Sequence, residues 1–253
     1  MMGARPALPA ARLDEAGPVT TLRALVSVRN LAEARLAAQA RVGFIDLKEP
    51  NDGALGGLAV AHIAQIVRAL REVAPGVPIS ATIGDWPAHA LAEIRERVRQ
   101  VAACGVDHVK VGIDPASASG PEALMALVEE LGRLDREGLP LVPVLIADNG
   151  VEPALLQRVC AQRFFAVMLD TADKRGGSLL QRLGAVELAG LIAQVRAHGS
   201  LIGLAGALQL CDLPALRRLA PDFAGFRSAV CVGDRREGMD ARLLAQLVEV
   251  LGA

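Results

Sequence analysis

The sequence predicts an α/β fold, a single (βα)₈ TIM barrel, from three observations. The chain has 253 residues, and barrels of this class typically have about 250. From residue 22 onward, short apolar or β-branched runs alternate eight times with longer amphipathic segments. The apolar residues are mainly Ala, Leu and Val, which fill barrel interiors and helix–sheet interfaces well.

The strands are predicted from short apolar runs bounded by turn residues. They are residues 22–28, 43–48, 78–83, 107–112, 140–146, 164–169, 200–204 and 223–227. The helices are predicted from apolar residues that recur every three to four positions. They are residues 30–41, 59–72, 88–103, 121–137, 152–162, 179–198, 212–219 and 239–251. Regular alternation indicates parallel strands, and eight strands indicate closure into a barrel.

An open, doubly wound sheet is the competing architecture. Such a sheet usually carries a glycine-rich phosphate loop after its first strand. Here the first strand is followed by Ser27-Val28-Arg29-Asn30, without a GxGxxG motif. We therefore predict a barrel over residues 21–253, preceded by a loose N-terminal extension over residues 1–20.

The composition excludes several classes of partner. The net charge is −1 and no long run of either sign occurs, so no basic surface for nucleic acid or an anionic membrane is expected. Five Phe, one Trp and no Tyr are too few for a base-stacking platform. No apolar stretch reaches the about 20 residues of a membrane span, and residues 1–20 lack a signal-peptide core. We expect a cytoplasmic protein.

The four cysteines (Cys104, Cys160, Cys211 and Cys231) are widely separated. They form no CxxC motif, and no His lies at metal-ligand spacing. We expect reduced, buried thiols that behave as small hydrophobic side chains, and no metal site.

The lysines are the compositional anomaly. Of 27 basic residues only three are lysines, namely Lys48, Lys110 and Lys174. Arg stays protonated, whereas Lys becomes an amine nucleophile once burial or a neighbouring cation lowers its pKa. Chance retention at the surface is the alternative explanation. All three fall within or just beyond predicted strands, on the side where barrels build their active sites.

The two-residue period of strands points several charges inward. Asp46 and Lys48 share one face of their strand, and Lys110 and Asp170 lie on the inward register of theirs. An Asp46–Lys48 structural ion pair is one explanation, but it does not account for three lysines and several acids at one barrel mouth. Clustered ammonium groups lower the pKa of at least one of them, toward roughly 7–8, which suits a nucleophile. The residues alone therefore predict a lysine-dependent, aldolase-type lyase.

Two later loops predict a phosphorylated substrate. The loops after strands seven and eight of a barrel often bind phosphate through backbone N–H groups. Here they contain Gly206-Ala207 and Arg227-Ser228, which offer small residues, a hydroxyl and a guanidinium.

Other polar residues have simpler interpretations. Asp85 follows strand three and is a possible site residue, with a helix N-cap as the alternative. Asp148-Asn149-Gly150 after strand five is either a site loop or a plain turn, and we favour the turn. Arg235 and Arg236 are interpreted as solvated charges, with a second anion site as the alternative.

At these residues the sequence resembles a known family. The blocks Ile45-Asp46-Leu47-Lys48-Glu49-Pro50 and Leu169-Asp170-Thr171-Ala172-Asp173-Lys174 are similar to those of the (5-formylfuran-3-yl)methyl phosphate synthases. Weaker similar blocks lie at 53–56, 80–85, 108–112 and 225–227, so that the resemblance covers about residues 22–250.

The resemblance implies a cofactor-free, metal-free lyase on a (βα)₈ barrel. It would condense two glyceraldehyde 3-phosphate molecules, with loss of one phosphate and water, into the furan precursor of methanofuran. Lys48 would match the Schiff-base lysine and Asp46 its neighbouring carboxylate. The other charged catalytic positions would be Lys110, Asp170 and Lys174, and the phosphate loops would contain Gly206, Arg227 and Ser228.

The sequence departs from the family pattern at two places. Roughly twenty residues precede strand one, and Ala207 stands where a serine is expected, which removes a hydroxyl from the phosphate loop. Two other functions remain open: a class I aldolase for another phosphorylated aldehyde, and a non-catalytic barrel that binds a sugar phosphate. The Ala- and Leu-rich outer helices favour a homo-oligomer.

Overall fold

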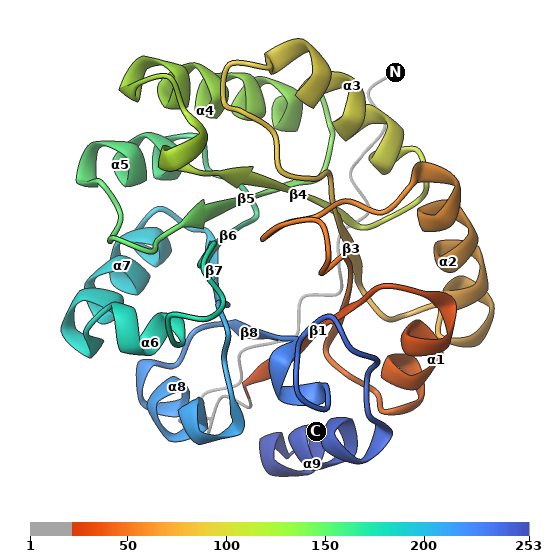
Figure 1. Cartoon of the computed structure of the whole chain (residues 1–253). Helices are drawn as coiled ribbons and strands as arrows, with labels where there is room; N and C mark the ends of the chain where they lie inside the picture. Colours follow the sequence, from red (N-terminus) through yellow and green to blue (C-terminus); the bar gives the residue numbers. More distant parts are fainter. Residues whose placement is uncertain (1–21, 253) are drawn as a thin grey trace.

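The computed structural model describes residues 22–252, so the predicted extension over residues 1–20 lies outside the described residues. Eight parallel strands close a barrel in chain order, and helices surround it (Figure 1). This arrangement confirms the predicted TIM barrel. The strands are β1 (Arg23–Val28), β2 (Phe44–Leu47), β3 (Ile79–Thr82), β4 (His108–Ile113), β5 (Leu141–Ile146), β6 (Ala166–Asp170), β7 (Leu201–Leu204) and β8 (Phe223–Phe226).

Each predicted helix has a counterpart in the structure. The α-helices are α1 (Leu31–Gln39), α2 (Val60–Val73), α3 (Leu91–Ala102), α4 (Pro121–Arg136), α5 (Pro153–Ala161), α6 (Leu179–Arg182), α7 (Ala185–Ala197), α8 (Leu213–Leu219) and α9 (Ala241–Leu251). Three short 3₁₀ turns accompany them: η1 (Pro115–Ser117), η2 (Leu210–Asp212) and η3 (Ser228–Val230).

The predicted helix over 179–198 is wrong as a single element. Ser178 and Gln181 form a capping box that starts α6, and the chain leaves helical geometry at Leu183, where φ is −107° and ψ is 129°. Gly184 then serves as the N-cap of α7. Apolar periodicity continues across the break, which explains why the sequence pattern predicts one helix.

Two apolar layers support the barrel. The outer layer packs strands against helices and contains Ile45, Leu47, Val109 and Val111, so the alternating residues Asp46, Lys48 and Lys110 face inward as predicted. The inner cluster lies within the barrel and consists of Leu25, Leu55, Val142, Val144, Ile146, Ala166, Met168, Ala205 and Phe223. Charged side chains that point into the barrel therefore lie beside apolar neighbours, where little water reaches them.

The loop between β2 and α2 closes part of the barrel mouth. Its Leu55 is buried in the inner cluster, and a Cβ atom at Gly112 would lie 2.8 Å from Leu55 Cδ1. Thr82 Oγ1 donates a hydrogen bond of 2.8 Å to the carbonyl of Gly56. The bare backbone at Gly112 thus leaves the space that the Leu55 side chain occupies.

The cysteine prediction is confirmed in part. All four cysteines are free thiols; Cys160 and Cys231 are buried, but Cys211 is exposed because it lies in η2 on the outer surface. Over residues 22–252, no helix has the length and apolar character needed to cross a membrane.

Candidate active site

The barrel interior brings the predicted charged residues together. Asp46, Lys48, Lys110 and Asp170 come from β2, β4 and β6 or the residue after them, and their exposed fractions are 0%, 6%, 3% and 3%. Alternate strands of a barrel contribute side chains to the same inward layer, which explains why only even-numbered strands supply these charges. Lys174, in the loop after β6, completes the cluster.

Asp46 is the partner of Lys110. Lys110 Nζ lies 2.8 Å from Asp46 Oδ2, and the carboxylate also accepts hydrogen bonds from Ser80 Oγ at 2.6 Å and Ser27 Oγ at 3.1 Å. Both carboxylate oxygens are thereby satisfied in the interior. The proposed Asp46–Lys48 ion pair is absent from the described contacts, because side chains two positions apart on a strand project in parallel, about 7 Å apart.

Asp170 is the partner of Lys48. Lys48 Nζ lies 3.5 Å from Asp170 Oδ2, while the Lys174 amine contacts Asp170 Oδ1 and the carbonyl of Thr171. One buried carboxylate thus joins two amines. Lys48 itself follows the last residue of β2, and its backbone N–H donates to the carbonyl of Val28 at 3.0 Å, which fixes its place beside β1.

The surroundings of Lys48 favour its neutral amine. Burial lowers the pKa of Lys48 to about 7; Asp170 and Asp46 oppose this change, whereas Lys174 and Lys110 add to it. Burial also opposes ionisation of Asp170, but Lys174 and Lys48 outweigh it and hold the pKa of this carboxyl well below its ordinary value. The site therefore holds a partly unprotonated amine beside a permanent carboxylate near neutral pH.

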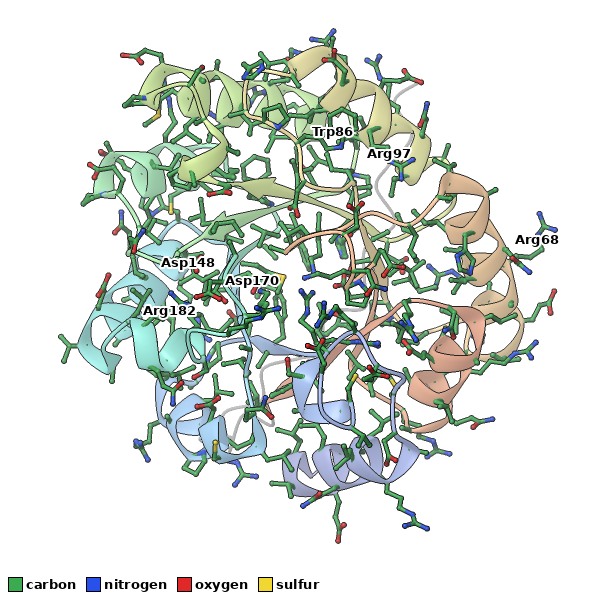
Figure 2. The ribbon with its side chains drawn as sticks, viewed as in Figure 1. Arg68, Trp86, Arg97, Asp148, Asp170 and Arg182 are labelled. Atoms are coloured by element: carbon green, nitrogen blue, oxygen red, sulfur yellow. The ribbon has the colours of Figure 1, made fainter. Side chains whose placement is uncertain are left out.

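The loop that carries Lys174 is anchored by Asp148, which lies in the predicted turn after β5. The Asp148 carboxylate accepts hydrogen bonds from the backbone N–H groups of Ala172, at 2.5 Å, and Asp173, at 3.0 Å. Arg182 of α6 forms ion pairs with both Asp148 and Asp173. Figure 2 labels Arg182 and Asp148. These contacts favour the site-loop alternative for Asp148, although its partners, more than twenty residues away, are not evident from the sequence.

The loop after β7 has the backbone geometry expected for close approach to an anion. Gly206 and Ala207 have φ angles of 107° and 49°. A Cβ atom at Gly206 would lie 2.9 Å from Thr171 Oγ1, so this position requires glycine for space as well as conformation. Both residues line a cavity with Lys48, Asp170, Lys174 and Ser228.

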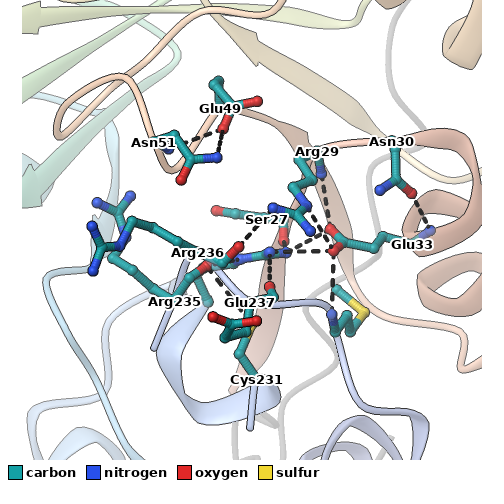
Figure 3. Close-up of polar contacts among 12 residues, drawn as sticks. Ser27, Arg29, Asn30, Glu33, Glu49, Asn51, Cys231, Arg235, Arg236 and Glu237 are labelled. Carbon is teal, nitrogen blue, oxygen red and sulfur yellow. Dashed lines mark hydrogen bonds and ion pairs between the residues drawn. The ribbon is translucent and has the colours of Figure 1, made fainter. Parts of the chain in front are cut away.

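Arg227 lies at this cavity but is already fully bonded. Its guanidinium pairs with Glu33 of α1 at 2.6 Å and 3.2 Å, and it also donates to the carbonyls of Ser27, Arg235 and Glu237 (Figure 3). A guanidinium has five N–H donors, and these contacts use all of them. In this structure Arg227 anchors the loop between β8 and α9 and has no donor left for a phosphate.

Asp85 anchors the loop between β2 and α2. Its carboxylate accepts a hydrogen bond from the backbone N–H of Leu55, at 3.2 Å from either oxygen. Burial raises the pKa of Asp85. The N-cap alternative is wrong, because α3 begins at Leu91 and Ala90 occupies its N-cap.

A larger cavity continues outward from the lysine cluster. It has a volume of about 560 Å³ and shares Lys174, Ala207, Ser228 and Arg235 with the inner cavity. Arg175, Asp173, Asp234 and Arg236 also line it. Over residues 22–252, no group of three or more His, Cys, Asp or Glu side chains is placed to hold a metal ion.

Fold and site together define a (βα)₈ barrel with a buried lysine–carboxylate cluster at the carboxyl ends of its strands. The sequence model of one family, described as 4-HFC-P synthase, matches residues 24–248. The chain belongs to the 4-HFC-P synthase family.

Related proteins agree with this assignment. A protein of Methylorubrum extorquens, provisionally named a (5-formylfuran-3-yl)methyl phosphate synthase, is 36% identical over 91% of this chain and 92% of its own. The (5-formylfuran-3-yl)methyl phosphate synthase of Methanosarcina acetivorans is 32% identical over 90% of this chain and 98% of its own. The synthase of the same name from Methanopyrus kandleri is 33% identical, with the same coverage.

Solved structures agree on the fold. Phosphoribosyl anthranilate isomerase from Thermus thermophilus superposes with a TM-score of 0.63, at 17% identity, over 91% of this chain and 98% of its own. At this identity the likeness concerns the barrel alone.

Proposed function

We propose that the chain condenses two glyceraldehyde 3-phosphate molecules into (5-formylfuran-3-yl)methyl phosphate, as a lyase in the biosynthesis of methanofuran or an analogue. The observation that carries the proposal is the Lys48 amine, buried, with its pKa lowered to about 7, and 3.5 Å from Asp170. Such an amine attacks an aldehyde without first losing a proton to solvent. The names of the family and of its relatives support the choice of product.

The first step forms a Schiff base at Lys48. The amine adds to the aldehyde carbon of one triose phosphate, and the resulting carbinolamine loses its hydroxyl as water. That departure needs a proton, and Lys174, held against Asp170 and the Thr171 carbonyl, is placed to donate it. Asp170 stabilises the positive charge of the iminium that forms, because its carboxylate stays ionised.

The second step converts the iminium to a nucleophile. Loss of a proton from the adjacent carbon gives an enamine, and we assign that proton to Lys174, which is left as a neutral amine beside Asp170 after it has protonated the departing hydroxyl. The enamine then forms the carbon–carbon bond to the second triose phosphate. Ring closure follows, and hydrolysis of the imine restores the Lys48 amine. The overall reaction releases one phosphate and two water molecules for each furan phosphate formed.

Asp46 and Lys110 have a different task in this scheme. Asp46 is fully bonded to Lys110, Ser80 and Ser27, so it orients Lys110 toward the reacting centre. We assign proton transfer in the later dehydration to Lys110, and positioning to Asp46.

The backbone around Gly206 and Ala207 and the Ser228 hydroxyl would hold the phosphate of the Lys48-bound triose. Both loops line the cavity that contains the Lys48 and Asp170 side chains. The serine hydroxyl that Ala207 lacks would be replaced by backbone N–H donors, which small residues leave accessible. Arg227 stabilises this region indirectly through Glu33 and the loop between β8 and α9.

Incubation of the purified chain with glyceraldehyde 3-phosphate alone tests the proposal. We expect furan absorbance to appear together with one phosphate per furan, and Lys48→Arg to lower the rate by about 1,000-fold or more, since arginine keeps the charge without the amine. Cleavage or formation of another phosphorylated aldehyde without furan would favour the class I aldolase. Binding without turnover or covalent adduct would favour the non-catalytic barrel.

A further inference from the structure

We propose that Arg235, assisted by Arg175, forms a second anion subsite that holds the phosphate of the incoming, non-covalent triose phosphate. This inference rests on the proposed function, because it assigns a place to the second substrate. The subsite lies in the outer cavity of about 560 Å³, at its junction with the lysine cluster.

The first argument is the number of anions that the reaction requires. Two triose phosphates must be present together, and each carries a phosphate dianion. The backbone at Gly206 and Ala207 together with Ser228 offers one cradle, beside Lys48. A second phosphate in the same place would be repelled by the first, so a separate cationic position is needed.

The second argument is which guanidinium groups at the barrel mouth are already neutralised. Arg227 is paired with Glu33, Arg182 with Asp173, and Arg236 with Asp234. Over residues 22–252 the side chains of Arg235 and Arg175 make no ion pair. These two guanidinium groups therefore supply the uncompensated positive charge in the outer cavity.

The position of Arg235 adds a third argument. Its side chain is half-buried and lines both cavities, and its side-chain contact is a 3.3 Å hydrogen bond from Nη1 to the carbonyl of Gly53. Burial lowers the pKa of Arg235, and the carboxylates of Asp170, Asp234 and Asp85 oppose this change from a distance without forming an ion pair with it. A phosphate dianion would supply the missing counter-charge and bind bidentately.

The loop that carries Arg235 is anchored by hydrogen bonds from two other arginines. The Arg235 carbonyl accepts a hydrogen bond of 2.8 Å from Arg227 Nε, and Arg29 Nη1 donates to the carbonyl of Arg236 at 2.6 Å (Figure 3). The Glu33–Arg227 pair thus fixes the backbone on which Arg235 projects toward the cavity. The cavity also contains the carboxylates of Asp173 and Asp234, but each is bound by its own arginine.

The simpler explanation is that Arg235 only links the β8–α9 loop to the β2–α2 loop, through its hydrogen bond to the Gly53 carbonyl. Arg235→Gln separates the two roles, because glutamine keeps an N–H donor for the Gly53 carbonyl and loses the charge. Arg68→Met is the control, since Arg68 projects outward from α2 (Figure 2).

The experiment is calorimetric titration with glycerol 3-phosphate, which has no aldehyde and cannot form a Schiff base. We expect the wild type and Arg68→Met to bind two molecules per chain. Arg235→Gln should keep one site within about threefold and weaken the other by about 10- to 100-fold, the loss expected for charge-assisted hydrogen bonds. With glyceraldehyde 3-phosphate, the variant should still form the borohydride-trapped adduct on Lys48 while furan formation falls by a similar factor.

Three results would overturn the inference: one binding site in the wild type, two unchanged sites in Arg235→Gln, or equal loss of trapped adduct and furan in that variant. The last would place Arg235 at the first substrate. A wild type that binds two molecules, loses one on Arg235→Gln and makes no furan would support the subsite while the proposed function fails.

Discussion

The partner of Lys48 decides how its amine is activated. Asp170 lies on β6, so the carboxylate approaches from the other side of the barrel and also holds Lys174. Lys48 therefore shares its counter-ion with a second amine. Its protonated form is stabilised less than it would be in a one-to-one ion pair. Burial and this sharing together account for an amine whose pKa is about 7.

The pKa of Lys48 predicts a pH dependence of stability. The ordinary lysine value is 10.5 and the folded value is about 7, so between these values the unfolded chain binds one proton more than the folded chain at this residue. The contribution of Lys48 to the free energy of unfolding therefore rises as the pH increases through this window, and it is constant below about pH 7.

Comparison of wild type with Lys48→Met isolates this contribution, because methionine has similar length and no charge. We expect the wild-type minus variant difference in unfolding free energy, from urea denaturation, to rise between about pH 7 and 9.5. A difference that stays constant or falls across this range would show that the folded amine keeps its proton.

Strand alternation predicts which charged residues face inward but not which of them meet. Asp46, Lys48, Lys110 and Asp170 all lie in the interior as expected. Their pairing depends on the distance across the barrel, which the sequence pattern does not contain. The role of Arg227 is unpredictable for the same reason, because its partner Glu33 lies 194 positions away.

The loop between β2 and α2 packs into the barrel mouth. Leu55 enters the barrel mouth beside Gly112 of β4, and the Asp85 carboxylate holds the Leu55 backbone. The loop thereby places an apolar side chain near the lysine cluster and limits its hydration. A glycine-rich segment after a strand predicts a loop, but it does not predict that one leucine within it is buried.

We expect Gly112→Ala to destabilise the fold by about 1–3 kcal/mol, because the new methyl group would lie 2.8 Å from Leu55 Cδ1. Leu55→Ala removes a buried side chain and is itself destabilising, but Gly112→Ala should cost less in the Leu55→Ala background than alone, so that the two changes are non-additive in urea denaturation.

Gly190→Ala in α7 is the matched control. No atom lies within 4 Å of the Cβ position there, and helix propensity predicts a gain of about 0.5–1 kcal/mol. Strict additivity of the Gly112 and Leu55 changes would contradict the close packing of these two residues.

At the scale of the whole molecule, the sequence suffices for the architecture. Eight alternations of strand and helix predict closure, and the strands pair in chain order as a barrel requires. The pattern fails within the segment over 179–198, where Gly184 and the capping box at Ser178 divide a continuous apolar periodicity into α6 and α7.

The site is predictable to a lesser degree than the fold. Rarity of lysine identifies Lys48, Lys110 and Lys174. Their positions within strands or just beyond them place all three at one mouth of the barrel. Ser27, Ser80 and Glu33 are not identified, because each acts through a contact made only after the barrel closes.

The most direct test of the central claim is the location of the covalent adduct. The chain is mixed with glyceraldehyde 3-phosphate, reduced with borohydride, digested and analysed by mass spectrometry. We predict one triose-derived mass addition, on Lys48 alone, with trapping that increases as the pH rises through about 7. An adduct on Lys110 or Lys174, or no adduct at all, would contradict the assignment of Lys48 as the reacting amine.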